Sequence, residues 1–454
     1  FVVIGGGISG LAIGALLTHI EKRVLLVEKN KQLGGRARVK EKLGFKLDNG
    51  LHLLKYGEKS PLIEIINQLN LDRSSSLSIL PIRHYHLYVG DEVENIKPNF
   101  YERRKRKWWN RGWISVPRNM NEIRSHNYFT AWKLMKIFTT GFKYDYNKIK
   151  AQSLTEFIKN NNIENVAARY LKLAAGVLIH CPYSSAVSAG EVIRHIKWSS
   201  KQTVLFGYPK SGWSSIIDIF VDEIKKTGEI RLDSEVRNFL FEDNEIVGIQ
   251  TDKEKIVSKN IIIAVPPQNL PSIYQDSNGN SMLPDNLKEF IDSLTPTVGV
   301  SFDFALESKI YNEKSFLYTE NPNGYGIFLS NLDDSIVPKH EEIFKAFIPL
   351  SPKRYDDKKY VRENIAKARD YIYDLFPKLE RNVIFEEVVT HDLVDSTQIN
   401  TEQYKDARPN PRDSGLKGVY LVGDYINAYG SGGELAYNSV LKAFKQIKED
   451  LGKS

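Results

Sequence analysis

The sequence predicts an α/β fold, a parallel sheet with helices on both faces, from three observations at the start of the chain. Residues 1–4 form a short apolar strand that runs directly into a glycine-rich turn at residues 5–10. Small and aliphatic residues then recur at helical spacing up to Ile20. A second apolar run, residues 24–27, follows and ends on Glu28. This order of strand, glycine turn, helix and strand is typical of a unit that binds a dinucleotide.

Composition places the chain among ordinary globular proteins. It has 454 residues, of which 41% are hydrophobic and 26% charged, so disordered and collagen-like classes are excluded. The single cysteine, Cys181, excludes an intramolecular disulfide and Cys-based zinc or iron–sulfur sites, and we expect no metal site. A reducing, cytoplasmic location fits this cysteine usage best. No signal peptide is visible, and no clean apolar run is long enough to span a membrane.

Each residue of the glycine turn has a physical role. Gly5 permits the tight turn from strand to helix, Gly7 lets the backbone approach a pyrophosphate, and Gly10 lets the helix lie close to the sheet. The helix N-terminus directs unpaired N–H groups at the phosphates. Glu28 can accept hydrogen bonds from a ribose diol and would repel the 2′-phosphate of NADP. The cofactor-binding residues expected here are Gly5, Gly7, Ile8, Ser9, Gly10, Glu28 and Lys29.

A second phosphate-binding segment follows the acidic residue. Gly34 and Gly35 precede Arg36, and paired glycines beside a guanidinium make a concave, positively charged site for phosphate. Residues 48–52 then read Asp-Asn-Gly-Leu-His. Together these motifs resemble the FAD-dependent amine oxidase and phytoene desaturase superfamily. The resemblance implies that FAD is the cofactor, with Gly34, Gly35, Arg36, Gly50, Leu51 and His52 among its contacts.

The resemblance continues in the middle and at the end of the chain. Residues 208–213 read Tyr-Pro-Lys-Ser-Gly-Trp and resemble the family's Y-P-x-G-G segment, with Ser211 in place of a glycine. Further on, the family implies that Val236 contacts adenine through its backbone. The strand at residues 418–424 ends in Gly423-Asp424, where the family places an acid on the ribityl or phosphate region.

A last helix should begin against the flavin ring, where its positive end would stabilise a reduced ring. The resemblance places Gly433, Glu434 and Leu435 at this contact. The family pattern is closer to E-G-A-x-x-S-G, so Leu435 and Val440 replace two glycines. The helix contact with the flavin is therefore expected to differ from the family's.

The separated motifs imply a Rossmann-like FAD domain assembled from discontinuous segments. We assign residues 1–70, 200–268 and 385–454 to this domain. The insertions, residues 71–199 and 269–384, would form an α+β substrate domain that can face a membrane. Strand-like runs at 327–329 and 344–348 and a charged helix at 361–375 lie in the second insertion.

The catalytic residues are not identified by any motif, because hydride transfer to a flavin requires no side-chain base. Candidates for the flavin face are Leu51, His52, Tyr425 and Tyr429. Tyr429 aligns with an aromatic-cage position of amine oxidases, and loop packing explains it equally well. Cys181 lies outside every flavin motif, so we expect FAD to be bound non-covalently.

Two segments combine basic and aromatic residues. Residues 103–113 contain five consecutive cations followed by tryptophans, and residues 128–138 form an aromatic, apolar helix candidate with two lysines. One interpretation is docking on an anionic membrane surface, where rings sit at headgroup level and cations pair with phosphates. The other is a solvated hairpin and an ordinary core helix. Nucleic-acid binding is not expected, because no nucleic-acid-binding fold accompanies the basic run.

The sequence therefore predicts a FAD-dependent oxidoreductase that acts on a hydrophobic isoprenoid or carotenoid-like substrate. The reaction expected is desaturation, dehydrogenation or isomerisation, with hydride transfer to flavin N5. The alternatives are a flavin amine oxidase and a protoporphyrinogen oxidase. A further alternative is a flavin-binding protein that docks on membranes without turnover.

Overall fold

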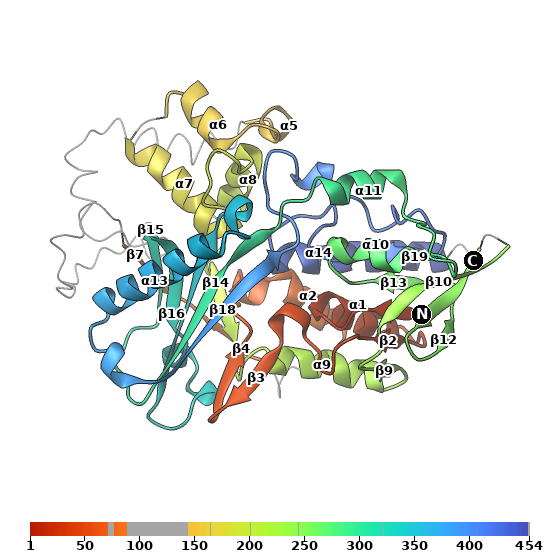
Figure 1. Cartoon of the computed structure of the whole chain (residues 1–454), viewed down its shortest axis with the longest axis horizontal. Coiled ribbons are helices and arrows are strands. Elements are labelled where there is room, and N and C mark those ends of the chain that lie inside the picture. The colour runs from red at the N-terminus through yellow and green to blue at the C-terminus, as the bar shows by residue number, and fades with distance from the viewer. Residues whose placement is uncertain are drawn as a thin grey trace.

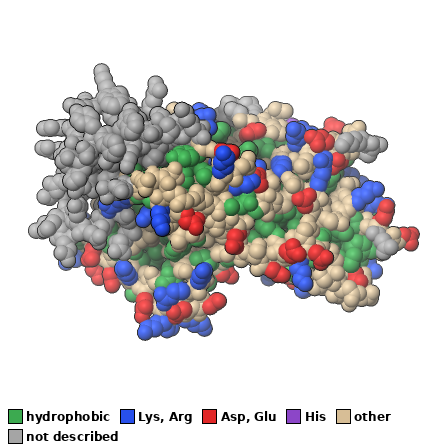
Figure 2. Space-filling model, turned by 90° about the horizontal axis from the view of Figure 1, so that it is seen from above, with side chains coloured by type: hydrophobic (Ala, Val, Ile, Leu, Met, Phe, Trp, Pro, Cys, Tyr) green, Lys and Arg blue, Asp and Glu red, His purple; other side chains and the backbone are tan. Residues whose placement is uncertain are grey.

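The computed structural model describes residues 1–70, 77–88, 144–163, 165–199, 201–243, 245–320 and 322–452. A parallel sheet with its helices forms one end of the molecule, and a larger sheet with a long helix forms the other (Figure 1). Both basic-aromatic segments, 103–113 and 128–138, lie outside the described residues. In Figure 2, acidic and basic side chains are interspersed over the described part of the visible face.

Five short strands far apart in sequence build the parallel sheet. Their order is β19-β13-β1-β2-β9, and every neighbouring pair runs parallel. Burial on both faces explains why β1, β2 and β13 read as continuous aliphatic runs, whereas the edge strand β9 carries Glu229 and Arg231. The predicted α/β fold with a discontinuous parallel sheet is thereby confirmed. The strands are β1 (Val2–Ile4), β2 (Leu25–Val27), β9 (Glu229–Arg231), β13 (Ile261–Ile263) and β19 (Val419–Leu421).

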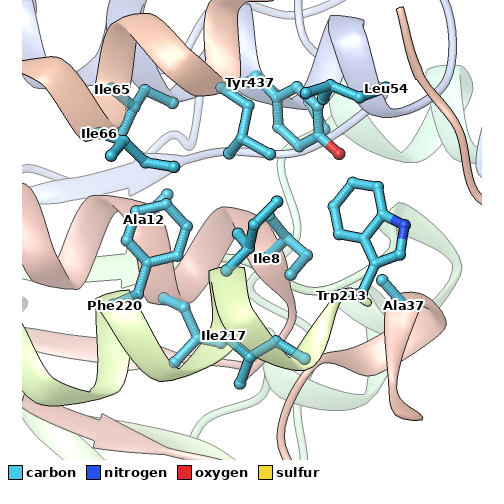
Figure 3. Packing of buried hydrophobic residues seen from close by; sticks show 14 of the residues in the cluster. Ile8, Ala12, Ala37, Leu54, Ile65, Ile66, Trp213, Ile217, Phe220 and Tyr437 are labelled. Atoms are coloured by element: carbon cyan, nitrogen blue, oxygen red, sulfur yellow. The ribbon is translucent and has the colours of Figure 1, made fainter. Parts of the chain in front are cut away.

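Four helices pack together on one face of this sheet. Side chains of all four meet in one apolar cluster, which includes Ile8, Ile66, Phe220 and Tyr437 (Figure 3). Gly14 brings α1 close to α9, because a Cβ there would lie 3.0 Å from Ile224 Cδ1. The helices are α1 (Ile8–His19), α2 (Pro61–Gln68), α9 (Ser214–Lys225) and α14 (Gly433–Leu451).

The other face of the parallel sheet is covered mainly by a second, antiparallel sheet. Val2, Ile4 and Ile263 share a core there with Phe239 and Tyr274. A small antiparallel layer and short helices therefore occupy the face where sequence reasoning expected helices alone. The elements are β10 (Val236–Glu242), β11 (Glu245–Thr251), β12 (Lys255–Val257), α10 (Leu270–Ile273) and α11 (Asp285–Asp292).

A six-stranded sheet in the order β18-β14-β17-β16-β15-β7 forms the other end. Its apolar core includes Phe304, Phe344 and residues of α13 (Lys358–Leu375), which matches the charged helix expected at 361–375. The assigned boundary at residue 385 falls inside β18, so this sheet extends into the segment assigned to the FAD domain. The strands are β7 (His84–Tyr88), β14 (Thr297–Leu306), β15 (Ser315–Glu320), β16 (Asn323–Phe328), β17 (Glu342–Leu350) and β18 (Val383–Asp395).

The remaining elements connect the two ends. Helices α5 to α8 share an apolar cluster with Cys181 at its centre. A small antiparallel sheet has the strand order β5-β8-β6. Among the described residues, no helix is long and apolar enough to cross a membrane. These elements are β3 (Val39–Lys42), β4 (Phe45–Asp48), β5 (Leu54–Lys55), β6 (Ile79–Pro81), β8 (Phe206–Pro209), α5 (Tyr146–Ile149), α6 (Leu154–Asn160), α7 (Asn165–Ile179), α8 (Ala189–Ser199) and α12 (Leu329–Leu332).

Candidate cofactor and substrate site

One pocket of about 690 Å³ collects most of the predicted site residues. It begins where β1 and β2 end, which is where ligands bind in open parallel sheets. From there it continues toward the six-stranded sheet. Predicted residues on its wall are Gly5, Gly7, Ile8, Ser9, Glu28, Lys29, Gly34, Gly35, Arg36, Gly50, Leu51, His52, Val236, Gly423, Asp424 and Gly433.

The two glycine segments face each other and form a cradle of bare backbone. Gly34 N donates to Gly6 O over 2.8 Å, and Gly7 and Gly34 are paired as an isolated parallel bridge. A Cβ on Gly7 would have Gly35 Cα at 4.0 Å as its nearest described neighbour, so the space beside Gly7 is open. Gly34 and Gly35 both have positive φ angles, 99° and 57°, which glycine adopts without strain. Open space beside bare amides at a helix N-terminus fits a diphosphate.

Behind this cradle, two glycines serve packing. A Cβ on Gly10 would lie 1.9 Å from Gly5 O, and one on Gly5 would lie 2.8 Å from Ala264 O. Gly10 is therefore under the turn, as the close helix packing predicted, and does not line the pocket. Gly10 therefore supports cofactor binding only indirectly, because its missing side chain allows α1 to begin at this point.

Glu28 lies on the pocket wall directly after β2. Its Oε2 accepts a hydrogen bond from Gly6 N at 2.6 Å, and its Oε1 accepts two from the backbone and side chain of Asn30. The carboxylate is 7% exposed and lines the pocket with Lys29 and Val236. Because each carboxylate oxygen has two lone pairs, acceptor capacity remains for a ribose hydroxyl.

Arg36 and Asp424 bind each other, which the sequence did not indicate. The guanidinium donates two parallel hydrogen bonds to the carboxylate, at 2.8 and 2.9 Å, and a third to Val394 O. Asp424 also accepts from Ser396 N at 2.8 Å. Burial raises the pKa of Asp424, but the charge and hydrogen bonds of Arg36 outweigh burial and hold that pKa below its usual value. The pair fixes Arg36 at the pocket wall beside the glycine cradle.

Two neutral imidazoles face the pocket beyond Gly50. Burial, with the nearby charge of Lys345, lowers the pKa of His52 to about 3, and its Nδ1 has no hydrogen-bond partner among the described residues. Burial and Arg38 lower the pKa of His391 to about 4, and its Nε2 lies 2.7 Å from Ser301 Oγ. Uncharged rings at this end suit an uncharged ligand surface.

The start of α14 reaches the pocket through Gly433, but its next two residues turn away. Leu435 is 1% exposed, and Glu434 is a buried carboxyl whose pKa is raised by burial. Tyr425 is fully buried in the core on the other face of the parallel sheet. Tyr429 is 61% exposed, with the guanidinium of Arg194 over its ring. The structure therefore places neither tyrosine on the pocket wall, unlike Leu51 and His52.

Sequence reasoning missed the far side of the pocket, which we call the aromatic wall: Phe206, Phe316, Tyr325 and Phe347. Successive ring centroids are 5.1, 5.6 and 5.3 Å apart, so the four rings form a continuous surface. They come from β8, β15, β16 and β17. Only the cross-strand pairing of Tyr325 with Phe347 could have indicated the cluster, and pairing is not visible in one sequence.

Cys181 and the histidines that the structure describes form no metal site. Cys181 is fully buried in the cluster around α7, away from the pocket wall, and burial raises its pKa to about 12. Among the residues that the structure describes, no group of three or more potential ligands could hold a metal ion.

The comparisons with known proteins agree with this geometry. Residues 8–443 match the family described as "Flavin containing amine oxidoreductase". A 4,4'-diapolycopen-4-al dehydrogenase from Metabacillus indicus is 21% identical over 479 residues, covering 94% of this chain and 93% of that protein. An oxidoreductase from Methanosarcina mazei has a similar structure, with a TM-score of 0.75, 19% identity and 99% of each chain covered. A triple mutant of putrescine oxidase has a TM-score of 0.72 at 13% identity, with 100% of this chain and 98% of that chain covered.

The two structural likenesses show the fold, whereas the match to the family shows that the chain belongs to it. The family contains a flavin. The flavin that requires both a diphosphate cradle and a nucleoside end is FAD, and this pocket provides both. The chain is therefore a FAD-dependent oxidoreductase that belongs to the flavin-containing amine oxidoreductase family.

Proposed function

We propose that this enzyme dehydrogenates or isomerises a hydrophobic isoprenoid or carotenoid-like substrate. The observation that carries the proposal is the aromatic wall, which continues the cofactor pocket toward the six-stranded sheet. Each of its rings is buried or nearly so, with Phe316 at 3% and Phe347 at 4% exposure. Flat aromatic faces bind a planar conjugated chain by dispersion and stacking, without requiring a charge on the ligand.

The charges around the pocket support the same substrate class. His52 and His391 are uncharged at neutral pH, because burial lowers the pKa of each. Arg36 has Asp424 as its partner, so its charge is largely compensated. The relative from Metabacillus indicus, named for a polyene aldehyde, also favours a long apolar substrate.

Within this proposal, the chain's own residues bind and orient. The bound FAD supplies the acceptor for a hydride. Gly7, Gly34 and Gly35 would hold its diphosphate, Glu28 and Val236 its nucleoside end, and the segment from Gly50 to His52 would lie beside the ring. The aromatic wall would hold the substrate against that ring and exclude water from it. We also propose that residues 1–70, 200–268 and 385–454 form the FAD domain, except that β18 belongs to the six-stranded sheet although the boundary at 385 falls inside it.

An anaerobic titration of the holoenzyme tests the substrate class. We expect a linear polyene aldehyde or desaturable isoprenoid, delivered in detergent micelles, to bleach the flavin absorbance. Putrescine, benzylamine and protoporphyrinogen should leave it unchanged. Bleaching by an amine or by protoporphyrinogen alone would contradict the proposal and support the corresponding oxidase. Bleaching by none of the probes would support a flavin-binding protein without turnover.

A pair of variants links the activity to the aromatic wall. Phe316→Leu removes the ring between Phe206 and Tyr325, and loss of about 1 kcal/mol of ring contact should raise KM for the polyene roughly fivefold to tenfold. The flavin spectrum should not change. Phe239→Leu, in the core on the other face of the parallel sheet, is the matched control and should leave KM unaltered.

A further inference from the structure

A histidine occupies a strained position at the edge of the aromatic wall. Helix α7 ends at Ile179, and His180 follows it with φ +59°. This left-handed position after a helix is usually glycine, since other side chains meet a steric cost there. His180 nevertheless lines the pocket. Glycine would adopt this backbone conformation without steric cost. A histidine at this position therefore indicates that the imidazole has a function.

The imidazole lies between the aromatic wall and the start of α14. Its ring centroid is 6.0 Å from that of Tyr325, and its Cε1 would be 3.7 Å from a Cβ on Gly432. Its Nδ1 is 3.6 Å from Asp395 Oδ2, slightly beyond hydrogen-bonding distance. A carboxylate facing Nδ1 favours the tautomer with the proton on that nitrogen. Nε2, the other ring nitrogen, makes no hydrogen bond with any residue that the structure describes, and it is then an acceptor.

The titratable neighbours of His180 come from three elements. Asp395 approaches from β18, Lys55 from β5, and the neutral phenol of Tyr325 from β16. Lys55 is buried, donates to Leu178 O at 2.6 Å and contacts the Ser431 hydroxyl. Burial and the charge of Lys55 lower the pKa of His180, outweighing Asp395. The imidazole is therefore neutral at physiological pH and can accept a proton.

We propose that His180, oriented by Asp395, accepts the proton that leaves the substrate during dehydrogenation; the inference rests on the proposed function. Forming a carbon–carbon double bond removes two hydrogens from adjacent carbons. One leaves with both electrons of its C–H bond to the flavin, the oxidant. The other leaves as a proton to Nε2 of His180, and the electrons of its C–H bond become the new π bond. Electrons and atoms therefore balance without another reactant.

The other two imidazoles on the pocket wall are poorer acceptors. Ser301 Oγ already occupies Nε2 of His391 at 2.7 Å. Burial lowers the pKa of His52 to about 3, and its ring packs edge-on against Trp213 and not against the aromatic wall. His180 alone among the three combines a neutral ring, a carboxylate at Nδ1 and contact with the aromatic wall.

The test compares flavin reduction in the wild-type holoenzyme and three variants, mixed anaerobically with a polyene substrate in a stopped-flow instrument. His180→Asn tolerates the left-handed backbone and removes the base. It should slow flavin reduction about 100-fold, the usual minimum for losing a general base. His180→Gly should be equally slow, keep its fold, and regain rate when imidazole is added. Asp395→Asn should be slowed less than His180→Asn.

The pH dependence separates a proton acceptor from a residue with a structural role. Because the neutral imidazole is the active form and its pKa is lowered, the wild-type rate should stay constant at neutral and alkaline pH. It should fall only as the pH drops through the depressed pKa of His180. His180→Asn should lose this acid limb while keeping the flavin spectrum.

The possible results distinguish a failure of the role of His180 from a failure of the proposed function. Reduction of wild type and His180→Asn at equal rates, with the same pH profile, would overturn the role of His180 and leave the proposed function intact. A wild-type enzyme that no polyene reduces would overturn the proposed function, and this inference with it. Slow reduction of His180→Gly that imidazole does not rescue would argue for a structural role.

Discussion

Replacing Gly7 with alanine is expected to abolish tight FAD binding while leaving the apoprotein as stable as wild type. Gly7 has φ −72° and ψ 173°, a conformation that alanine also adopts. The new Cβ would have Gly35 Cα, 4.0 Å away, as its nearest neighbour, so it strains nothing in the protein. It would instead enter the space proposed for the diphosphate. We expect the dissociation constant for FAD to rise at least about 100-fold, or about 2.7 kcal/mol.

Gly10→Ala is the contrasting control in the same turn. Its Cβ would lie 1.9 Å from Gly5 O, so the clash is with backbone inside the protein. This variant should lose thermal stability even without cofactor. Fluorescence titration with FAD and thermal unfolding of both apoproteins measure the difference. A Gly7→Ala protein that binds FAD as tightly as wild type would contradict the assignment of the cradle.

Replacing Lys345 with methionine is expected to cause the largest loss of stability, about 3–5 kcal/mol, because it leaves a buried charge without its partner. Lys345 is 1% exposed, and its Nζ donates to Asp303 Oδ2 at 2.7 Å and to Asp48 O at 3.1 Å. Asp48 lies two residues before Gly50, where the segment from Gly50 to His52 begins on the pocket wall. Loss of the hydrogen bond from Lys345 to Asp48 should also weaken FAD retention. Denaturant unfolding at constant pH measures the change.

The stability lost in Lys345→Met should be larger at high pH than at low pH. Burial raises the pKa of Asp303, and burial likewise raises the pKa of Asp48 to about 6, even with Lys345 present. A carboxyl whose pKa is higher in the folded state costs stability when ionised, and that cost disappears as it takes up a proton. The defect of Lys345→Met should therefore be largest near pH 8 and shrink toward pH 5. The double variant Lys345→Met/Asp303→Leu should regain much of the stability. An equal defect at both pH values would contradict this explanation.

Local patterns in the sequence identified residues that the structure brings together in one pocket, the proposed cofactor half of the site. The strand, glycine turn and following acid are close in sequence, so their spacing alone determines that Gly5, Gly7 and Glu28 meet at one pocket. Likewise, aliphatic runs identified β1, β2 and β13 of the parallel sheet. The resemblance to a family added Val236, Gly423 and Asp424, all of which line that pocket.

The substrate half depends on pairings that one sequence does not reveal. The partner of Arg36 is Asp424, 388 residues away, and neither residue signals the other. The aromatic wall requires three strands of the six-stranded sheet in a particular register, together with β8 from another sheet. The sequence makes Tyr425 and Tyr429 candidates for the flavin face, Tyr429 because it aligns with an aromatic-cage position of amine oxidases. The chain instead buries Tyr425 in the core on the other face of the parallel sheet and exposes Tyr429 on a loop.

Separated segments of the chain are expected to form one pocket that holds FAD without a covalent bond. The direct measurement is the flavin content of the purified protein, read from the absorbance of the supernatant after denaturation and precipitation. We expect one FAD per chain in the supernatant and none in the pellet, since Cys181 lies away from the pocket wall. A colourless protein that added FAD does not reconstitute would contradict the account, and flavin that stays with the pellet would contradict non-covalent binding.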